Sequence, residues 1–250
     1  MNHNPSNRRL APRLWNSDYA SLIGLKKVLQ WAIDKYTKPS GTDVLLDYGC
    51  GDVPYRSMFE DRVGKYIACD LYGNPDADLH YELDSIIPTD DDSADIVLSV
   101  QVLEHVRHVN TYLDEANRVL KSDGLLLLST HGWWTYHPFP HDYWRWTSEG
   151  LRTTLAEHGF EVVEHRWILG MLAYSSQLRV QTLKGILYER GGIIGKFLFG
   201  ILSSCYQVGM VLMDKVTPSS IGMNNSAIYL MVARKTAPGT TKAGDDSDSV

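Results

Sequence analysis

Hydrophobic residues along the chain alternate between helically spaced sets and short continuous runs. Residues 17–36 carry apolar side chains at helical spacing, and Pro39-Ser40-Gly41 ends the pattern. The later continuous runs predict strands over 43–46, 66–69, 96–99, 125–129, 160–164 and 227–233. Helical patterns separate them at 55–59, at 109–120 and from the Thr147 cap to Glu157. This alternation predicts an α/β fold with parallel strands and helices on both faces of the sheet.

A long helical insertion separates the last two predicted strands. Residues 170–222 predict two helices broken at Gly191-Gly192. The segment 197–213 contains no charged residue, but it is shorter than the roughly 20 apolar residues that cross a bilayer. The few polar or small positions fall on one narrow face: Lys196, Gly200, Ser203, Gln207 and Asp214. We therefore expect residues 193–213 to be covered by the hairpin partner, by a second subunit in a homodimer, or by peripheral contact with a membrane.

Length and composition predict one domain. The 250 residues are 44% hydrophobic and 22% charged, as in ordinary globular proteins. We expect a single domain over 1–236, with an N-terminal helical extension (1–39), a core (40–169), the hairpin (170–222) and a last strand (223–236). The Gly, Thr, Asp and Ser tail, 237–250, is predicted to be disordered.

Charge and cysteine usage narrow the partners and the location. The net charge of −6 argues against nucleic acid as a main partner and fits a small-molecule or glycan substrate. Cys50, Cys69 and Cys205 form neither a disulfide framework nor a zinc motif, and residues 1–13 lack the apolar stretch of a secretory signal. We expect a cytoplasmic protein, membrane-associated if the hairpin contacts lipid.

The strand over 43–46 leads into the most informative segment, an acidic turn with two glycines. Asp47 is followed by Gly49, Cys50 and Gly51, and a second acid, Asp70, stands about twenty residues on, where a second strand delivers a carboxylate to ribose hydroxyls. The third glycine of a dinucleotide fingerprint is missing. Asp47 would repel a pyrophosphate, but it can accept hydrogen bonds from the ammonium group of S-adenosylmethionine (SAM). SAM therefore fits this turn better than a nicotinamide dinucleotide.

Further motifs follow in a fixed order, in the segments 93–99, 102–106 and 115–124. With the acidic turn and Asp70, they make the chain resemble the class I SAM-dependent methyltransferases. The resemblance implies a Rossmann-like, seven-stranded, mostly parallel sheet whose last strand is antiparallel. The implied cofactor contacts are the turn residues Asp47, Gly49, Cys50 and Gly51, then Asp70 at the ribose, Leu71, Leu83 and Asp84 around the adenine, and Gln101 and Val102 near the sulfonium. Residues 48–56 and 137–147 resemble a subgroup associated with glycan and cell-surface polysaccharide biosynthesis.

The loop over 130–147 concentrates aromatic, histidine and charged side chains. Loops at the carboxyl ends of strands line the ligand crevice of an open α/β sheet, so these rings either bind a sugar-like acceptor or form a lid over the cofactor. An alcohol acceptor must also lose a proton, for which His105, His131, His137 and His141 are candidates. Our hypothesis favours His141 or His105 as the base, with Asp142 orienting an imidazole and Arg145 anchoring an acidic acceptor group. No metal is expected, since Pro138 and Pro140 disrupt a His137 and His141 pair.

The predicted function is SAM-dependent methylation of an oxygen on a saccharide or similar small molecule, which can be lipid-linked. The alternatives are methylation of a prenylated ring compound such as a quinone precursor, and a non-catalytic SAM-binding scaffold.

Overall fold

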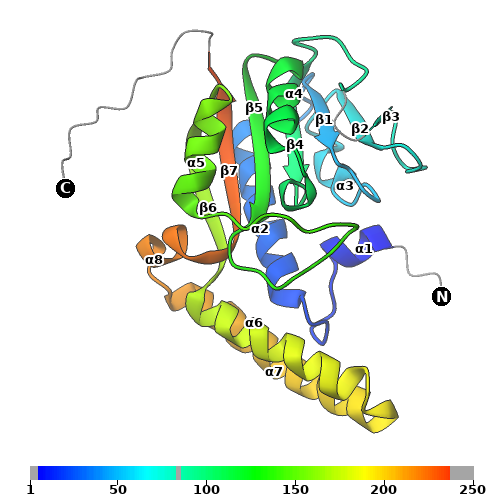
Figure 1. The fold of residues 1–250 in the computed structure, drawn as a ribbon, viewed down its shortest axis with the longest axis vertical. Coiled ribbons are helices and arrows are strands. Elements are labelled where there is room, and N and C mark those ends of the chain that lie inside the picture. Colours follow the sequence, from blue (N-terminus) through cyan, green and yellow to red (C-terminus); the bar gives the residue numbers. More distant parts are fainter. Residues whose placement is uncertain (1–4, 83–85, 237–250) are drawn as a thin grey trace.

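The structure, a computed structural model, describes residues 5–82 and 86–236, and its centre is a seven-stranded sheet (Figure 1). The strand order is β3-β2-β1-β4-β5-β7-β6, and β7 pairs antiparallel with β5 and β6 while the remaining pairs are parallel. The strands are β1 (Val44–Tyr48), β2 (Lys65–Leu71), β3 (Leu79–Tyr81), β4 (Ala94–Val100), β5 (Leu120–His131), β6 (Phe160–Gly170) and β7 (Ser226–Lys235). The predicted fold class is thereby confirmed.

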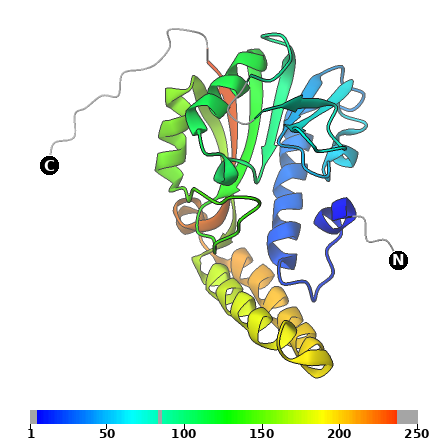
Figure 2. The same cartoon turned by 45° about the vertical axis from the view of Figure 1, so that its right-hand side comes forward.

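Helices cover both faces of this sheet (Figures 1 and 2). On one face, α2 (Tyr19–Tyr36) and α3 (Arg56–Phe59) bury residues such as Leu29 and Phe59 against strand side chains. On the other face, α4 (Val109–Val119) and α5 (Ser148–Glu157) bury Leu113 and Leu155. The described chain begins with α1 (Pro5–Leu10), and the short η1 (Leu103–His105) follows β4. Neighbouring residues on a strand point to opposite faces, so each central strand contributes to both cores.

Several strands are longer than their apolar runs predict. β5 begins at Leu120, because Asp123 takes a positive φ of 62° and the register shifts between Ala94 and Ile96. β6 continues past Glu164 to Gly170, since the antiparallel β7 supplies backbone partners along its whole length. Edge strand β3 has three residues and was not predicted. Pairing partners, rather than local hydrophobicity, set these strand ends.

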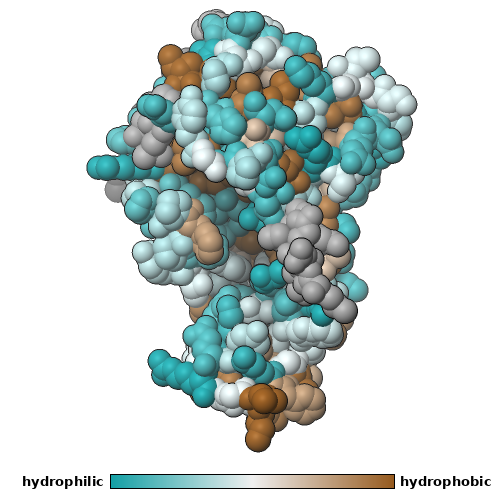
Figure 3. All heavy atoms as spheres, turned by 90° about the vertical axis from the view of Figure 1, so that its right-hand side faces the viewer, coloured by the Kyte–Doolittle hydropathy of each residue, from teal (hydrophilic) through white to brown (hydrophobic). Residues whose placement is uncertain are grey.

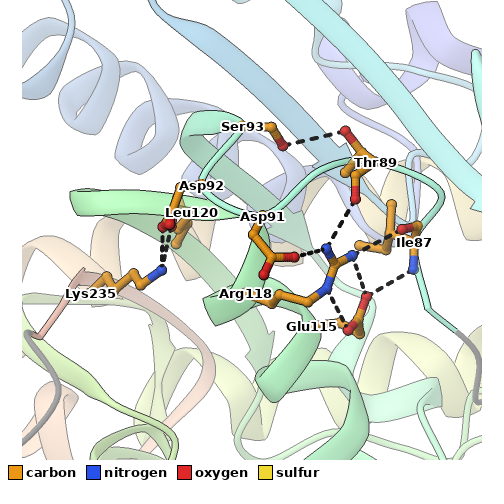
Figure 4. Close-up of polar contacts among 9 residues, drawn as sticks. All are labelled: Ile87, Thr89, Asp91, Asp92, Ser93, Glu115, Arg118, Leu120 and Lys235. Atoms are coloured by element: carbon orange, nitrogen blue, oxygen red, sulfur yellow. Dashed lines mark hydrogen bonds and ion pairs between the residues drawn. The ribbon is translucent and has the colours of Figure 1, made fainter.

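Arg118, at the end of α4, fastens the loop that leads into β4 (Figure 4). Its guanidinium donates to both carboxylate oxygens of Glu115 at 2.9 Å and to the Asp91 carboxylate at 2.6 Å. It also donates to the carbonyls of Ile87 and Thr89 at 2.9 and 3.0 Å. Glu115 in turn accepts from the Ile87 amide at 2.9 Å. Part of the 115–124 motif therefore serves the architecture of the loop rather than chemistry.

A helical hairpin stands between β6 and β7 and extends away from the sheet (Figures 1 and 2). It consists of α6 (Met171–Leu183), the π-helical turn η2 (Lys184–Tyr188) and α7 (Gly192–Val216), and α8 (Ser219–Asn224) leads back to β7. Along α7, the buried positions are Gly195, Phe199, Ser203, Gln207 and Met210. The polar face of α7 thus faces the protein, and much of its apolar surface faces outward.

Replacing Arg118 by Ala should lower the free energy of unfolding by about 2 to 4 kcal/mol, because the buried Glu115 carboxylate loses its charged partner and keeps only the Ile87 amide, and two loop carbonyls lose the Arg118 donor. Denaturant unfolding measures the change. Arg107→Ala, at an exposed position, is the control and should change stability by less than about 0.5 kcal/mol. Equal effects of the two substitutions would contradict the stabilising role of the Arg118 contacts to this loop.

Candidate active site

A cleft of about 1040 Å³ opens at the carboxyl ends of β1, β2, β4 and β5. Its walls come from the turns after these strands, from α1 and α2, and from the loop between β5 and α5. In open α/β sheets, this edge is where ligands bind. The predicted residues that line the cleft are Gly49, Gly51, Asp70, Leu71, Gln101, Val102, His105, His131, His137 and His141.

The turn after β1 depends on glycine for two separate reasons. Gly49 has a φ of 82° and Gly51 a φ of 54°, in the left-handed region that favours glycine. A Cβ on Gly49 would also lie 2.6 and 2.7 Å from the two methyl groups of Val102. The amides of Gly49 and Cys50 both donate to the Cys69 carbonyl, at 2.8 and 3.1 Å, which fixes the turn beside β2. The backbone of the turn therefore lies bare on the cleft wall.

Asp70 connects this turn to the end of β2. One carboxylate oxygen accepts from the Gly51 amide at 2.9 Å and from the Asn74 side chain at 2.6 Å, and the other accepts from the Leu71 amide at 2.8 Å. A carboxylate oxygen has more than one acceptor site, so the group can still receive hydroxyl donors from the cleft. Leu71 and Tyr81 line the cleft beside it and offer an apolar wall. The carboxylate, as an acceptor for two hydroxyls, and the apolar wall beside it fit the ribose and adenine of SAM.

Asp47 lies behind the turn rather than on the cleft wall. It is 2% exposed, is absent from the cleft lining, and accepts a short hydrogen bond from the Tyr66 hydroxyl. Burial raises the pKa of Asp47 to about 7, against the opposing effect of the Tyr66 hydrogen bond and with a further rise from the charge of Asp70. A direct contact between Asp47 and the SAM ammonium group stays a prediction.

The remaining predicted cofactor residues have different positions. Cys50 is buried and does not line the cleft, and burial raises the pKa of its thiol. Gln101, with a φ of 58°, is tied to β5 by its amide and side chain, which donate to the Ser129 carbonyl at 2.8 Å and hydroxyl at 3.0 Å. Leu83 and Asp84 lie outside the described residues.

The floor of the acceptor side of the cleft holds a buried acid and a buried histidine, Glu104 and His131. One Glu104 oxygen accepts from the Thr130 hydroxyl at 2.9 Å, and the other lies 3.3 Å from Nδ1 of His131. That second oxygen and the His131 Nδ1 are both buried without a hydrogen-bond partner. Burial raises the pKa of Glu104 to about 7 and lowers the pKa of His131 well below its usual value. The neutral imidazole is thus favoured at physiological pH.

Glu104 was missed as a site residue by the sequence reasoning, although it lies within the 102–106 motif. Its only signal was a carboxylate in an otherwise apolar segment, which in a buried setting needs a partner. That partner, His131, is far along the chain, and strand pairing between β4 and β5 brings the two together.

Asp142 and Arg145 hold the loop together rather than facing the cleft. Arg145 donates to both Asp142 oxygens at 2.6 Å and to the carbonyls of Trp134, Thr135 and Trp144 at 2.6 to 2.9 Å, which engages all five of its N–H groups. Asp142 also accepts from the His137 amide at 2.7 Å, and the Arg145 contact lowers its pKa to about 2. Both side chains are thus occupied within the loop, and the roles of Asp142 in orienting an imidazole and of Arg145 in anchoring an acceptor stay predictions. The basic side chains that line the cleft are Arg8, Arg9 and Lys184.

His105 and His141, the favoured bases, meet at the cleft wall. Nδ1 of His105 lies 2.5 Å from the His141 carbonyl, and because a carbonyl only accepts, Nδ1 is the donor. The other ring nitrogen of His105, Nε2, lies 4.0 Å from a Glu104 oxygen. Around them the loop supplies aromatic lining from Trp134, Tyr136 and Phe139. Within 5–82 and 86–236, no group of three or more His, Cys, Asp or Glu side chains is placed to hold a metal ion.

Comparisons with known proteins agree with this geometry. Residues 46–128 match the family described as "Methyltransferase domain". The [4+2]-cyclase SpnF has a similar fold, with a TM-score of 0.54 at 18% identity over 85% of this chain and 82% of its own. The complex of the Haloferax volcanii Trm112 methyltransferase activator with a candidate methyltransferase also matches, with a TM-score of 0.54 at 16% identity over 93% of this chain and 97% of the other.

A third solved structure carries a bound cofactor product. It is a Haemonchus contortus N-methyltransferase in complex with phosphomonomethylethanolamine and S-adenosylhomocysteine, with a TM-score of 0.50 at 17% identity over 84% of this chain and 53% of its own. No curated protein matches the chain.

The matched segment 46–128 contains the glycine turn, Asp70 and Glu104. Together with the observed strand order, this match supports SAM-dependent methyl transfer, with SAM as the cofactor. These comparisons do not identify the acceptor.

Asp70→Asn should weaken SAM binding roughly ten- to a hundredfold, because a hydrogen bond to a charged group contributes about 1.5 to 3 kcal/mol. Titration calorimetry measures the affinity. Asp76→Asn, an exposed acid on the same loop, is the matched control and should bind like the wild type. Unchanged affinity in Asp70→Asn would remove Asp70 from the site.

Glu104→Gln should alter the pH dependence of stability. In the wild type, the unfolded chain releases this proton near pH 4.5 and the folded chain near pH 7, so this group makes the free energy of unfolding fall as pH rises between these values. Gln cannot ionise, and the decline should become shallower while the part from Asp47 remains. Denaturant unfolding across this range measures the slope, and an identical slope in both proteins would show that Glu104 is not buried as an acid.

Proposed function

We propose that the protein methylates an oxygen of a saccharide or a similar small molecule, with His131 as the base and Glu104 as its positioning residue. The observation that carries this proposal is the buried Glu104 and His131 pair, 3.3 Å apart, on the floor of the cleft that also exposes the glycine turn. An alcohol needs a base to lose its proton during methyl transfer, whereas many nitrogen acceptors can react as free amines. A neutral imidazole on the acceptor side supports an oxygen acceptor.

As in the catalytic triads of hydrolases, a carboxylate lies next to Nδ1 of the histidine that acts as the base. A carboxylate beside Nδ1 favours the tautomer that carries its proton there, which frees Nε2 to accept a proton. Bound SAM supplies an electrophilic methyl group. As the acceptor oxygen forms its bond to that methyl carbon and the carbon–sulfur bond breaks, His131 takes the hydroxyl proton, and Glu104 stabilises the resulting imidazolium.

Aromatic rings around the pair support a ring-shaped acceptor. Trp134 stacks on His131 with ring centroids 5.0 Å apart and an interplanar angle of 10°. The ring centroid of Tyr174, in α6, lies 6.0 Å from that of Trp134. Tyr136 and Phe139 line the cleft and are largely exposed. Such faces suit the apolar face of a sugar, which is the basis for placing the protein in glycan biosynthesis. They would also accept an aromatic ring such as a quinol.

A cytoplasmic location is part of the proposal. It rests on the three cysteines, which are all free thiols, two buried and Cys205 exposed. A reducing compartment keeps such thiols free.

The acceptor class can be tested with labelled SAM and three sets of compounds: sugar nucleotides, lipid-linked saccharides and prenylated quinols. We expect label in the saccharides. Label confined to the quinols would support the ring-compound alternative, and tight SAM binding with no label in any acceptor or in host extract would support a scaffold.

His131→Asn should reduce turnover with the identified acceptor by about 10² to 10⁴-fold, since a positioned base contributes this much, while SAM affinity stays unchanged. His105→Ala and His141→Ala are the comparison variants. Because neither is the base in this proposal, each should lose less turnover than His131→Asn. In Glu104→Gln, the rise of turnover with pH near 7 should disappear. Full turnover in His131→Asn, or a larger loss in either comparison variant, would reassign the base.

A further inference from the structure

The α6 and α7 hairpin has its polarity reversed relative to a helix on the surface of a soluble protein. Gln207 accepts from the Ala20 amide at 2.8 Å, and the two Asp214 oxygens accept from the amides of Leu169 and Gly170 at 2.8 and 3.0 Å. Gln207 and Asp214 of α7 are therefore bound to the N-terminus of α2 and the end of β6. An ordinary surface helix places such residues in water and its apolar stripe on the core.

The opposite face of α7 is a continuous apolar stripe, defined as Ile193, Ile194, Phe197, Ile201, Val208 and Leu212. Every one of these side chains is exposed, and the three nearest the tip are 88%, 75% and 69% exposed. Their spacing of mostly four or seven residues puts them on one side of the helix. Figure 3 shows hydrophobic atoms gathered at the end of the molecule that the hairpin forms. An exposed stripe of this length marks an interaction surface.

Charge on the hairpin points to one kind of partner. Residues 171–224 carry five Lys or Arg and two acids, although the whole chain has a net charge of −6. Arg190 and Lys196 flank the tip and are exposed. Apolar side chains beside basic ones are the signature of helices that lie in the interface of an anionic membrane.

Packing on the domain argues that α7 lies along the membrane and does not cross it. By length and composition, α7 is the one helix in the described part of the chain that could span a bilayer. Its inner face, however, contacts α2, α6 and β6, and Gln207 and Asp214 are tied to backbone groups there. Crossing would require these contacts to break and leave buried polar groups in hydrocarbon.

The cleft is next to the same hairpin. Gln181 of α6 and Lys184 of η2 line it, and Tyr174 of α6 stacks on Trp134 of the acceptor loop. The hairpin that carries the exposed face of α7 therefore also forms part of the cleft wall, through α6 and η2.

We propose that the apolar stripe of α7, with Arg190 and Lys196, docks the protein on an anionic lipid bilayer and presents the cleft to acceptors anchored in that membrane. The second clause rests on the proposed function, whereas docking itself is independent of turnover. The proposal combines three features of the hairpin: the exposed apolar stripe of α7, the basic residues Arg190 and Lys196, and the part of the cleft wall formed by α6 and η2.

Vesicle flotation tests the docking with the full chain. The wild type should float with phosphatidylcholine vesicles that contain phosphatidylglycerol, and added salt should weaken this binding. Ile194→Glu with Phe197→Glu should lower the partition coefficient at least about tenfold, because it places two charges in the inserted face. Arg190→Gln with Lys196→Gln should lower binding to the anionic vesicles more than to pure phosphatidylcholine.

Tyr72→Glu is the matched control, since it also replaces an exposed hydrophobic side chain by an acid, but in the loop between β2 and β3. It should float like the wild type, and all variants should keep wild-type SAM affinity, which shows that they fold. Failure of the wild type to float, or equal flotation of Ile194→Glu with Phe197→Glu, would overturn the proposal. A wild-type dimer in light scattering that these two substitutions turn into a monomer would assign the stripe to a second copy of the chain instead.

Discussion

The close approach of Gly49 to Val102 is the constraint on which the site depends. A side chain at residue 49 would collide with the Val102 methyl groups at less than 3 Å, and the φ of 82° already favours glycine. With no side chain there, the turn folds back onto β2 and its next glycine amide reaches the Asp70 carboxylate. The same contact sets Val102 at the start of the segment that carries Glu104. One turn thus positions both the cofactor side and the acceptor side of the cleft.

Much of the fold was predictable because buried strands and amphipathic helices leave periodic patterns. The central strands and the last helix before β6 follow such patterns, and the Thr147 cap is present, with its hydroxyl accepting from the Gly150 amide at 3.0 Å. The start of β5 was not predictable, because it depends on pairing with Ala94 of β4, and the end of β6 was not, because it depends on pairing with β7. Periodicity also revealed the narrow polar face of α7. It did not reveal that this face turns toward the protein, because its partners are backbone amides of α2 and β6 that are distant in sequence.

The site was predictable in backbone and less so in side chains. Gly49, Gly51 and Asp70 follow from strand, turn and spacing. Arg145 looked free because sequence does not reveal that three loop carbonyls and Asp142 occupy its donors. Sequence also does not reveal that the Tyr66 hydroxyl of the neighbouring strand donates to Asp47, whose contact with the SAM ammonium group stays a prediction. Glu104 and His131 become a pair only through the registry of β4 with β5, which places ionisable groups together in a buried environment.

A crystal structure of the protein with S-adenosylhomocysteine would show directly whether Asp70 and the glycine turn hold the cofactor. In that structure we expect the two ribose hydroxyls to donate to the Asp70 carboxylate and the adenine to lie against Leu71 and Tyr81. The sulfur should lie between the glycine turn and the floor formed by Glu104 and His131. A nucleoside bound elsewhere, or one in this cleft without contact to Asp70, would contradict this placement.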